Sequence, residues 1–169
     1  NGSTSGNGGN VTISGGTSTI TGVGGYISFQ TATNGAVTER MKIAADGVIS
    51  TAVGSSVDFG ARYTELNSAV TAAASTTLNC ALGNNFTISM GANITTLSFS
   101  NVPASGRVYS MTLYLAYTGS FTVTWPASVK WAGGSAPTLT SANGKVDILT
   151  LVTKDNGTTW YGFVAGLNF

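Results

Sequence analysis

The stretch Arg107–Tyr117 reads Arg-Val-Tyr-Ser-Met-Thr-Leu-Tyr-Leu-Ala-Tyr. From Tyr109 onward, a large apolar side chain stands at every second position. Successive side chains of a β-strand point to opposite faces of the sheet, so this period of two predicts a strand with one buried face. That face is expected to hold Tyr109, Met111, Leu113, Leu115 and Tyr117. The stretch therefore predicts a β fold built around a hydrophobic core.

Further short strands are predicted on both sides of this one. They are Ala69–Ala73, Thr76–Leu82, Phe86–Met90, Thr96–Ser100, Phe121–Trp125, Lys145–Thr153 and Thr159–Ala165. Residues that favour turns lie between them, and no segment has the pattern of an amphipathic helix. Such strands and turns are typical of a β-sandwich or a jelly roll. We therefore expect residues 68–169 to form an all-β C-terminal domain, a jelly-roll-like β-sandwich.

Residues 1–67 are expected to form a separate stem of short strands. As far as Thr21 the chain consists mainly of Gly, Ser, Thr and Asn, with two short alternating segments at Asn10–Ser14 and Ser18–Thr21. A lone chain cannot bury enough apolar surface there to offset the entropy of ordering. These segments are therefore either a disordered linker or strands ordered by packing against other chains. The regular spacing of their apolar residues favours the strands.

A hairpin is predicted between Tyr26–Thr31 and Val37–Ile43, because Asn34-Gly35 between them is a strong turn signal. The second strand holds Glu39-Arg40-Met41-Lys42, and no charged residue precedes this cluster in the chain.

Adjacent charges of the cluster are badly placed to pair with one another. In a regular strand, Glu39 and Met41 point to one face, and Arg40 and Lys42 to the other. We therefore predict that Glu39, Arg40 and Lys42 pair between neighbouring chains and set their register.

The composition excludes several classes of partner. Only 8% of the 169 residues are charged, against about 25% in ordinary domains, and the net charge is +1. Nucleic-acid binding needs a concentrated basic face, so we expect no nucleic-acid partner. No apolar run approaches the roughly 18 residues of a membrane span, so we expect no membrane insertion. No signal peptide is visible, and because the chain begins with Asn1 we expect it to be part of a longer protein.

We expect no catalytic, metal or cofactor site. Histidine, the commonest general base and metal ligand, does not occur in the sequence. The six carboxylates show no facing pair of the kind that a glycosidase needs, and Asp46 and Asp155 lie in turns. Cys80 is the only cysteine, so no intramolecular disulfide can form, and its alternation with polar neighbours predicts a buried, small apolar residue. The sequence therefore favours a protein that is not an enzyme.

Aromatic residues are the remaining candidates for binding. Trp125 and Trp160 alternate with polar residues and are expected in the core. Trp131 follows a proline-marked strand end and is preceded by Lys130, so an exposed Trp131 could stack on a sugar ring. Tyr114 and Tyr117 are amphipathic and are candidates for a receptor groove or an interface between chains. The candidate receptor-binding residues are therefore Trp131, Lys130, Tyr117 and Tyr114.

Several segments resemble the tail fibres of tailed bacteriophages, in the distal C-terminal region that carries the receptor-binding tip. They are Gly25–Thr31, Thr38–Ile43, Asp46-Gly47-Val48, Thr122–Pro126, Val129–Trp131, Gly133-Gly134 and Asn156–Phe163. The resemblance implies an intertwined homotrimeric stem, a far end that contacts the host surface, upstream fibre proteins as partners, and a place in the virion, outside the cell.

Three functions remain open. The first is adhesion of a fibre tip to the host, by binding a surface glycan or a protein receptor. The low content of charged residues in the chain favours a neutral glycan. The second is purely structural, a virion fibre or a trimerisation cap that binds no receptor. The third is a bacterial adhesin or a carbohydrate-binding module.

Overall fold

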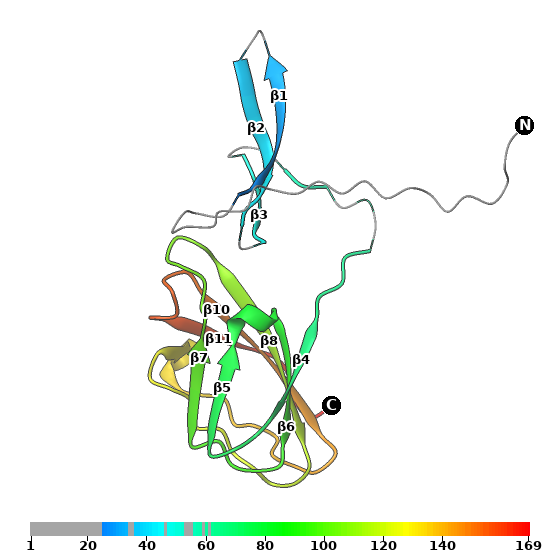
Figure 1. Cartoon of the computed structure of the whole chain (residues 1–169). Coiled ribbons are helices and arrows are strands. Elements are labelled where there is room, and N and C mark those ends of the chain that lie inside the picture. The colour runs from blue at the N-terminus through cyan, green and yellow to red at the C-terminus, as the bar shows by residue number, and fades with distance from the viewer. Residues whose placement is uncertain (1–24, 34–35, 46, 53–55, 59, 61) are drawn as a thin grey trace, which may run out of the picture. The chain divides into compact units, whose positions relative to one another are not determined.

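The structure is a computed structural model that describes residues 25–33, 36–45, 47–52, 56–58, 60 and 62–169. These residues are mostly β: their strands form three sheets, and they contain no α-helix (Figure 1). The chain divides into two compact units, Asn1–Arg62 and Tyr63–Phe169. Each unit is described by itself.

The first unit contains a three-stranded antiparallel sheet of β1 (Ile27–Thr33), β2 (Ala36–Ile43) and β3 (Ile49–Thr51). The pairing of β1 with β2, from Ile27 opposite Ile43 to Thr33 opposite Ala36, confirms the two predicted strands. The turn Asn34-Gly35, the residue Asp46 and the segments Asn10–Ser14 and Ser18–Thr21 lie outside the described residues.

A β-bulge interrupts the pairing of β1 with β2. Phe29 lies opposite Met41 and Gln30 lies opposite Glu39, so Arg40 is an extra residue on β2. Phe29 and Gln30 are consecutive and point to opposite faces, and so do their partners. The predicted face assignment is therefore wrong: Glu39 and Met41 do not share a face, because the extra residue shifts the alternation at Arg40.

The second unit is built on a six-stranded mixed sheet with the strand order β4-β6-β8-β10-β11-β9. Its strands are β4 (Asn67–Thr71), β6 (Asn85–Met90), β8 (Tyr109–Tyr117), β9 (Val129–Trp131), β10 (Val146–Thr153) and β11 (Trp160–Gly166). The strands β8, β10 and β11 pair antiparallel. The pairs β4–β6, β6–β8 and β9–β11 are parallel, unlike the antiparallel strands of a jelly roll.

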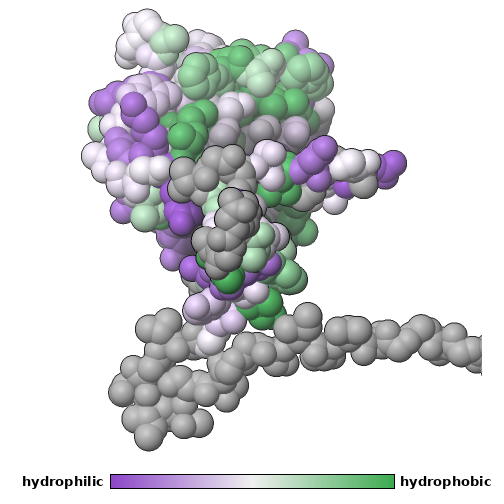
Figure 2. Space-filling view, turned by 90° about the horizontal axis from the view of Figure 1, so that it is seen from above, coloured by the Kyte–Doolittle hydropathy of each residue, from purple (hydrophilic) through white to green (hydrophobic). Residues whose placement is uncertain are grey.

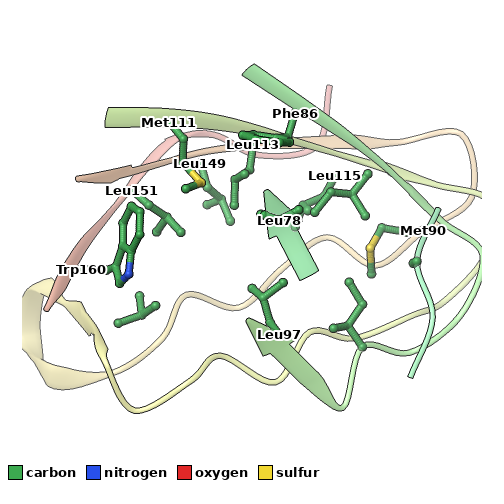
Figure 3. Close-up of a cluster of buried hydrophobic side chains, with 14 of the residues drawn as sticks. Leu78, Phe86, Met90, Leu97, Met111, Leu113, Leu115, Leu149, Leu151 and Trp160 are labelled. Carbon is green, nitrogen blue, oxygen red and sulfur yellow. The ribbon is translucent and has the colours of Figure 1, made fainter. Parts of the chain in front are cut away.

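A smaller parallel sheet of β5 (Ser75–Asn79) and β7 (Thr96–Ser100) lies across the core from the large sheet. Leu78 and Leu97 of the small sheet face Leu113, Leu115 and Leu149 of the large one (Figure 3). The predicted inward face of β8 is confirmed, since its five large side chains are all buried. Cys80 and Trp160 are buried in the same core, as expected.

Two predicted strands differ from the structure for local reasons. The strand beginning near Thr76 ends at Asn79, whose side-chain oxygen accepts a hydrogen bond from Ala81 N and starts the 3-10 helix η1 (Cys80–Leu82). The predicted strand Phe121–Trp125 makes only an isolated bridge, between Val123 and Ile94.

The strand β9 was not predicted. It has three residues, pairs parallel with β11, and ends in the 3-10 helix η2 (Ala132–Gly134). Gly133 and Gly134 have φ angles of 76° and 81°, which only glycine adopts without strain.

Candidate functional site

The charged residues of the hairpin contact neutral groups of the same hairpin. Glu39 Oε2 accepts a hydrogen bond of 2.9 Å from Ser28 Oγ, and Arg40 Nε donates one of 2.7 Å to Thr31 Oγ1. The ammonium group of Lys42 lies 5.5 Å from the centroid of the Tyr26 ring, a cation–π distance. Because these contacts are with neutral groups, Glu39, Arg40 and Lys42 retain the capacity to form ion pairs with another molecule.

The sheet of the first unit has no buried side chain among its described residues. Tyr26 is 59% exposed, Phe29 43% and Ile49 65%. Apolar side chains are thus exposed on a sheet of only three short strands. Such a small sheet needs a hydrophobic face packed against something else to be stable.

Trp131 lies on the edge strand β9 and is half-buried. Its ring packs edge-on against Trp125 at a centroid distance of 5.1 Å. It also covers Gly162, where an added Cβ atom would come within 2.6 Å of the Trp131 ring. Lys130 is exposed, and its ammonium group donates to Ala127 O at 2.8 Å. Trp131 is therefore fixed by its neighbours, and Lys130 beside it reaches solvent.

Lys130, Trp131, Tyr161 and Phe163 form a surface that we call the aromatic edge. Tyr161 and Phe163 of β11 are 44% and 54% exposed. Two neighbouring grooves of about 340 and 290 Å³ are lined by Trp131 and Phe163, with Ala132 and Gly162 between them. Figure 2 shows that hydrophobic residues also reach the surface of the chain in groups beside hydrophilic ones.

Tyr117 is buried, and its hydroxyl group donates a hydrogen bond of 3.2 Å to Asp147 Oδ2. Burial and the neighbouring carboxylate raise the pKa of Tyr117 above its ordinary value. The structure therefore places Tyr117 in the core of this chain, away from the surface where a receptor would bind.

The sequence analysis did not predict that Asp147 is a buried hydrogen-bond acceptor. It is fully buried in β10, and its carboxylate also accepts hydrogen bonds from Thr140 N, Thr140 Oγ1 and Asn168 N. A buried carboxylate with this many donors organises its surroundings. Its position on the inward face of an alternating strand was the available signal.

Tyr114 is half-buried on β8 and points away from the core, because its neighbours Leu113 and Leu115 point into it. It lines a separate groove on β4, β6 and β8, whereas the aromatic edge lies on β11 and β9, at the other end of the strand order. The structure thus brings Lys130 and Trp131 together and leaves Tyr114 and Tyr117 elsewhere.

Among the described residues, no three His, Cys, Asp or Glu side chains lie close enough together to hold a metal ion. In the same part of the chain, no helix is long and apolar enough to cross a membrane. Comparison of the chain with protein-family models, with curated proteins and with solved structures found no match in any of the three.

Proposed function

We propose that this chain is the distal part of a bacteriophage tail fibre, a homotrimer that attaches the virion to the host surface. The first unit is the intertwined stem that joins three chains, and the second unit is a two-layered β-sandwich at the tip. Upstream fibre proteins connect the stem to the virion. The protein catalyses no reaction and carries no cofactor.

The exposed apolar side chains of the first unit are the observation that carries this proposal. Phe29 and Ile49 lie on a sheet of three short strands that leaves them exposed, and Tyr26, directly before β1, is exposed as well. Three copies packed around a common axis cover such side chains with one another. The charges of Glu39, Arg40 and Lys42, whose partners among the described residues of the hairpin are neutral, then fix the register between chains.

Adhesion by the second unit is supported by its surface. The aromatic edge presents aromatic rings and a single cation on a unit with few charged residues. Aromatic side chains beside polar groups suit sugar rings, which have an apolar face and hydroxyl groups at the rim. Weak contacts at one tip become strong attachment when three tips and several fibres bind together.

A binding assay with bacterial cells tests adhesion directly. Fluorescently labelled chain is mixed with a panel of bacterial strains, sedimented and quantified, and excess unlabelled chain serves as competitor. A fibre tip gives saturable, competable binding to some strains. A chain that forms trimers but binds no strain is instead a trimerisation cap, the second function considered.

A further inference from the structure

A groove of about 310 Å³ lies on the outward face of the large sheet, away from the aromatic edge. It is lined by Glu65, Asn67, Asn85, Thr87 and Tyr114. Asn67 of β4 lies directly opposite Asn85 of β6, and Thr87 of β6 lies directly opposite Tyr114 of β8. Residues directly opposite share a face of the sheet, so three neighbouring strands bring these side chains together.

The polar side chains of this groove hold one another in place. Asn85 Nδ2 donates a 2.6 Å hydrogen bond to Glu65 Oε2, and Asn67 Nδ2 donates one of 3.0 Å to Thr87 Oγ1. A carboxylate can accept about four hydrogen bonds, and each amide carries a second N–H. The groove therefore combines fixed side chains with donors and acceptors that a ligand can still use, which lowers the entropy lost on binding.

Tyr114 adds an aromatic wall to this polar site. Its ring is held on the central strand β8 beside Thr87. In the described part of the chain, no residue forms a hydrogen bond with its hydroxyl group. A sugar residue matches this arrangement, because its C–H face can lie against the ring while adjacent hydroxyl groups bond to carboxylate and amide.

The charge of the groove further restricts the chemical class of ligand that it can bind. Among the described residues that line it, Glu65 is the only charged one, and none of them is a Lys or Arg that could bind a phosphate or a carboxylate. An anionic sugar would be repelled by Glu65. A volume of about 310 Å³ is at the lower end for small-molecule sites, which suits a single sugar residue.

We infer that this groove binds one neutral sugar residue of a surface glycan, with Tyr114 stacking on the ring and Glu65 and Asn85 bonding to its hydroxyl groups. The inference names a ligand and a second contact site for the proposed adhesion, and it rests on that proposed function.

Titration of the whole chain with neutral oligosaccharides, followed by ligand-observed NMR, tests this inference. The probes are oligosaccharides of hexoses, 6-deoxyhexoses and N-acetylhexosamines, each compared with a uronic-acid analogue. We expect saturable binding of at least one neutral probe and weaker binding of its acidic analogue. Tyr114→Ala and Asn85→Ala should weaken that binding about tenfold or more. Glu65→Gln keeps the shape of the side chain and should also weaken it.

Val108→Ala is the control, because Val108 is 75% exposed and lines neither this groove nor the grooves of the aromatic edge. It should leave sugar binding unchanged. Sugar binding that is kept with Tyr114→Ala and Glu65→Gln, as with the control, overturns the inference and leaves adhesion standing. If the chain binds cells but none of the sugar probes, the inference about this groove is also overturned, and adhesion still stands. A chain that binds neither cells nor sugars overturns both.

Discussion

The hydroxyl group of Tyr117 donates a hydrogen bond to the buried carboxylate of Asp147, 3.2 Å away and on the neighbouring strand. Asp147 also accepts bonds from the backbone of Thr140 and Asn168. One carboxylate thus joins β8, β10, the loop before β10 and the C-terminal end of the chain.

We predict that Asp147→Ala destabilises the second unit strongly. The substitution removes the acceptor of four hydrogen bonds, with donors from buried Tyr117, half-buried Thr140 and exposed Asn168, and we expect it to lower the free energy of unfolding by about 3 kcal/mol. Urea unfolding of the whole chain measures this effect. Tyr117→Phe removes only one of the donors and should cost about 1 kcal/mol. Equal midpoints for Asp147→Ala and the natural chain would contradict this account.

We predict that the second unit loses stability in alkali. Burial raises the pKa of Tyr109 and of Tyr117 above the ordinary value of 10.0. The folded state then holds protons that the unfolded state releases above about pH 10, so the free energy of unfolding falls as the pH rises beyond that value. Unfolding midpoints measured from about pH 8 to pH 11 test this.

The variant Tyr117→Phe removes one of these titrating groups. Its free energy of unfolding should therefore decline less steeply with pH than that of the natural chain. The same slope in both proteins would show that Tyr117 does not contribute.

We predict that Gly162→Ala disturbs the aromatic edge. The new methyl group would lie 2.6 Å from the Trp131 ring, so the ring must move and its packing against Trp125 must change. We expect a loss of about 1–3 kcal/mol in the free energy of unfolding, with a changed near-ultraviolet circular dichroism spectrum. Gly91→Ala is the control, because its methyl group would meet only Thr118 Oγ1 at 3.6 Å, an ordinary contact. An unchanged spectrum for Gly162→Ala would mean that Trp131 does not rest on Gly162.

We predict that Glu39→Gln weakens assembly and leaves the second unit folded. The substitution removes the charge that we propose to pair with Arg40 or Lys42 of another chain. Sedimentation velocity at decreasing concentration should show dissociation of the variant where the natural chain stays assembled, with the same unfolding temperature for the second unit. Ser28→Ala is the control, since it removes the partner of Glu39 within the chain and keeps its charge. Identical dissociation of Glu39→Gln and the natural chain would count against charge pairing between chains.

Strands could be predicted from the sequence wherever one face is buried. The alternation in Arg107–Tyr117 reflects its place in the centre of a sheet with a core on one side. Phe121–Trp125 alternates as well but is not a strand, because Thr122 N donates to the side chain of Asn93 instead of a neighbouring strand. The parallel pairs could not be predicted, since a period of two is the same for parallel and antiparallel strands.

The candidate sites were predictable only in part. The motif Lys130-Trp131 pointed to the aromatic edge, but Tyr161 and Phe163 join it only because β11 pairs with β9. The alternation of side chains along the second strand of the hairpin does not indicate the bulge at Arg40. The bulge changes which residues share a face with Glu39. The groove at Glu65 depends on the pairing of β4, β6 and β8, so its residues come together only in the folded chain.

The central claim is that three chains assemble through the first unit. Static light scattering of the purified chain at micromolar concentration tests it most directly. We predict a mass three times the 17.1 kDa of one chain. A mass equal to that of one chain would contradict the account, because the exposed side chains of the hairpin would then have no partner to cover them.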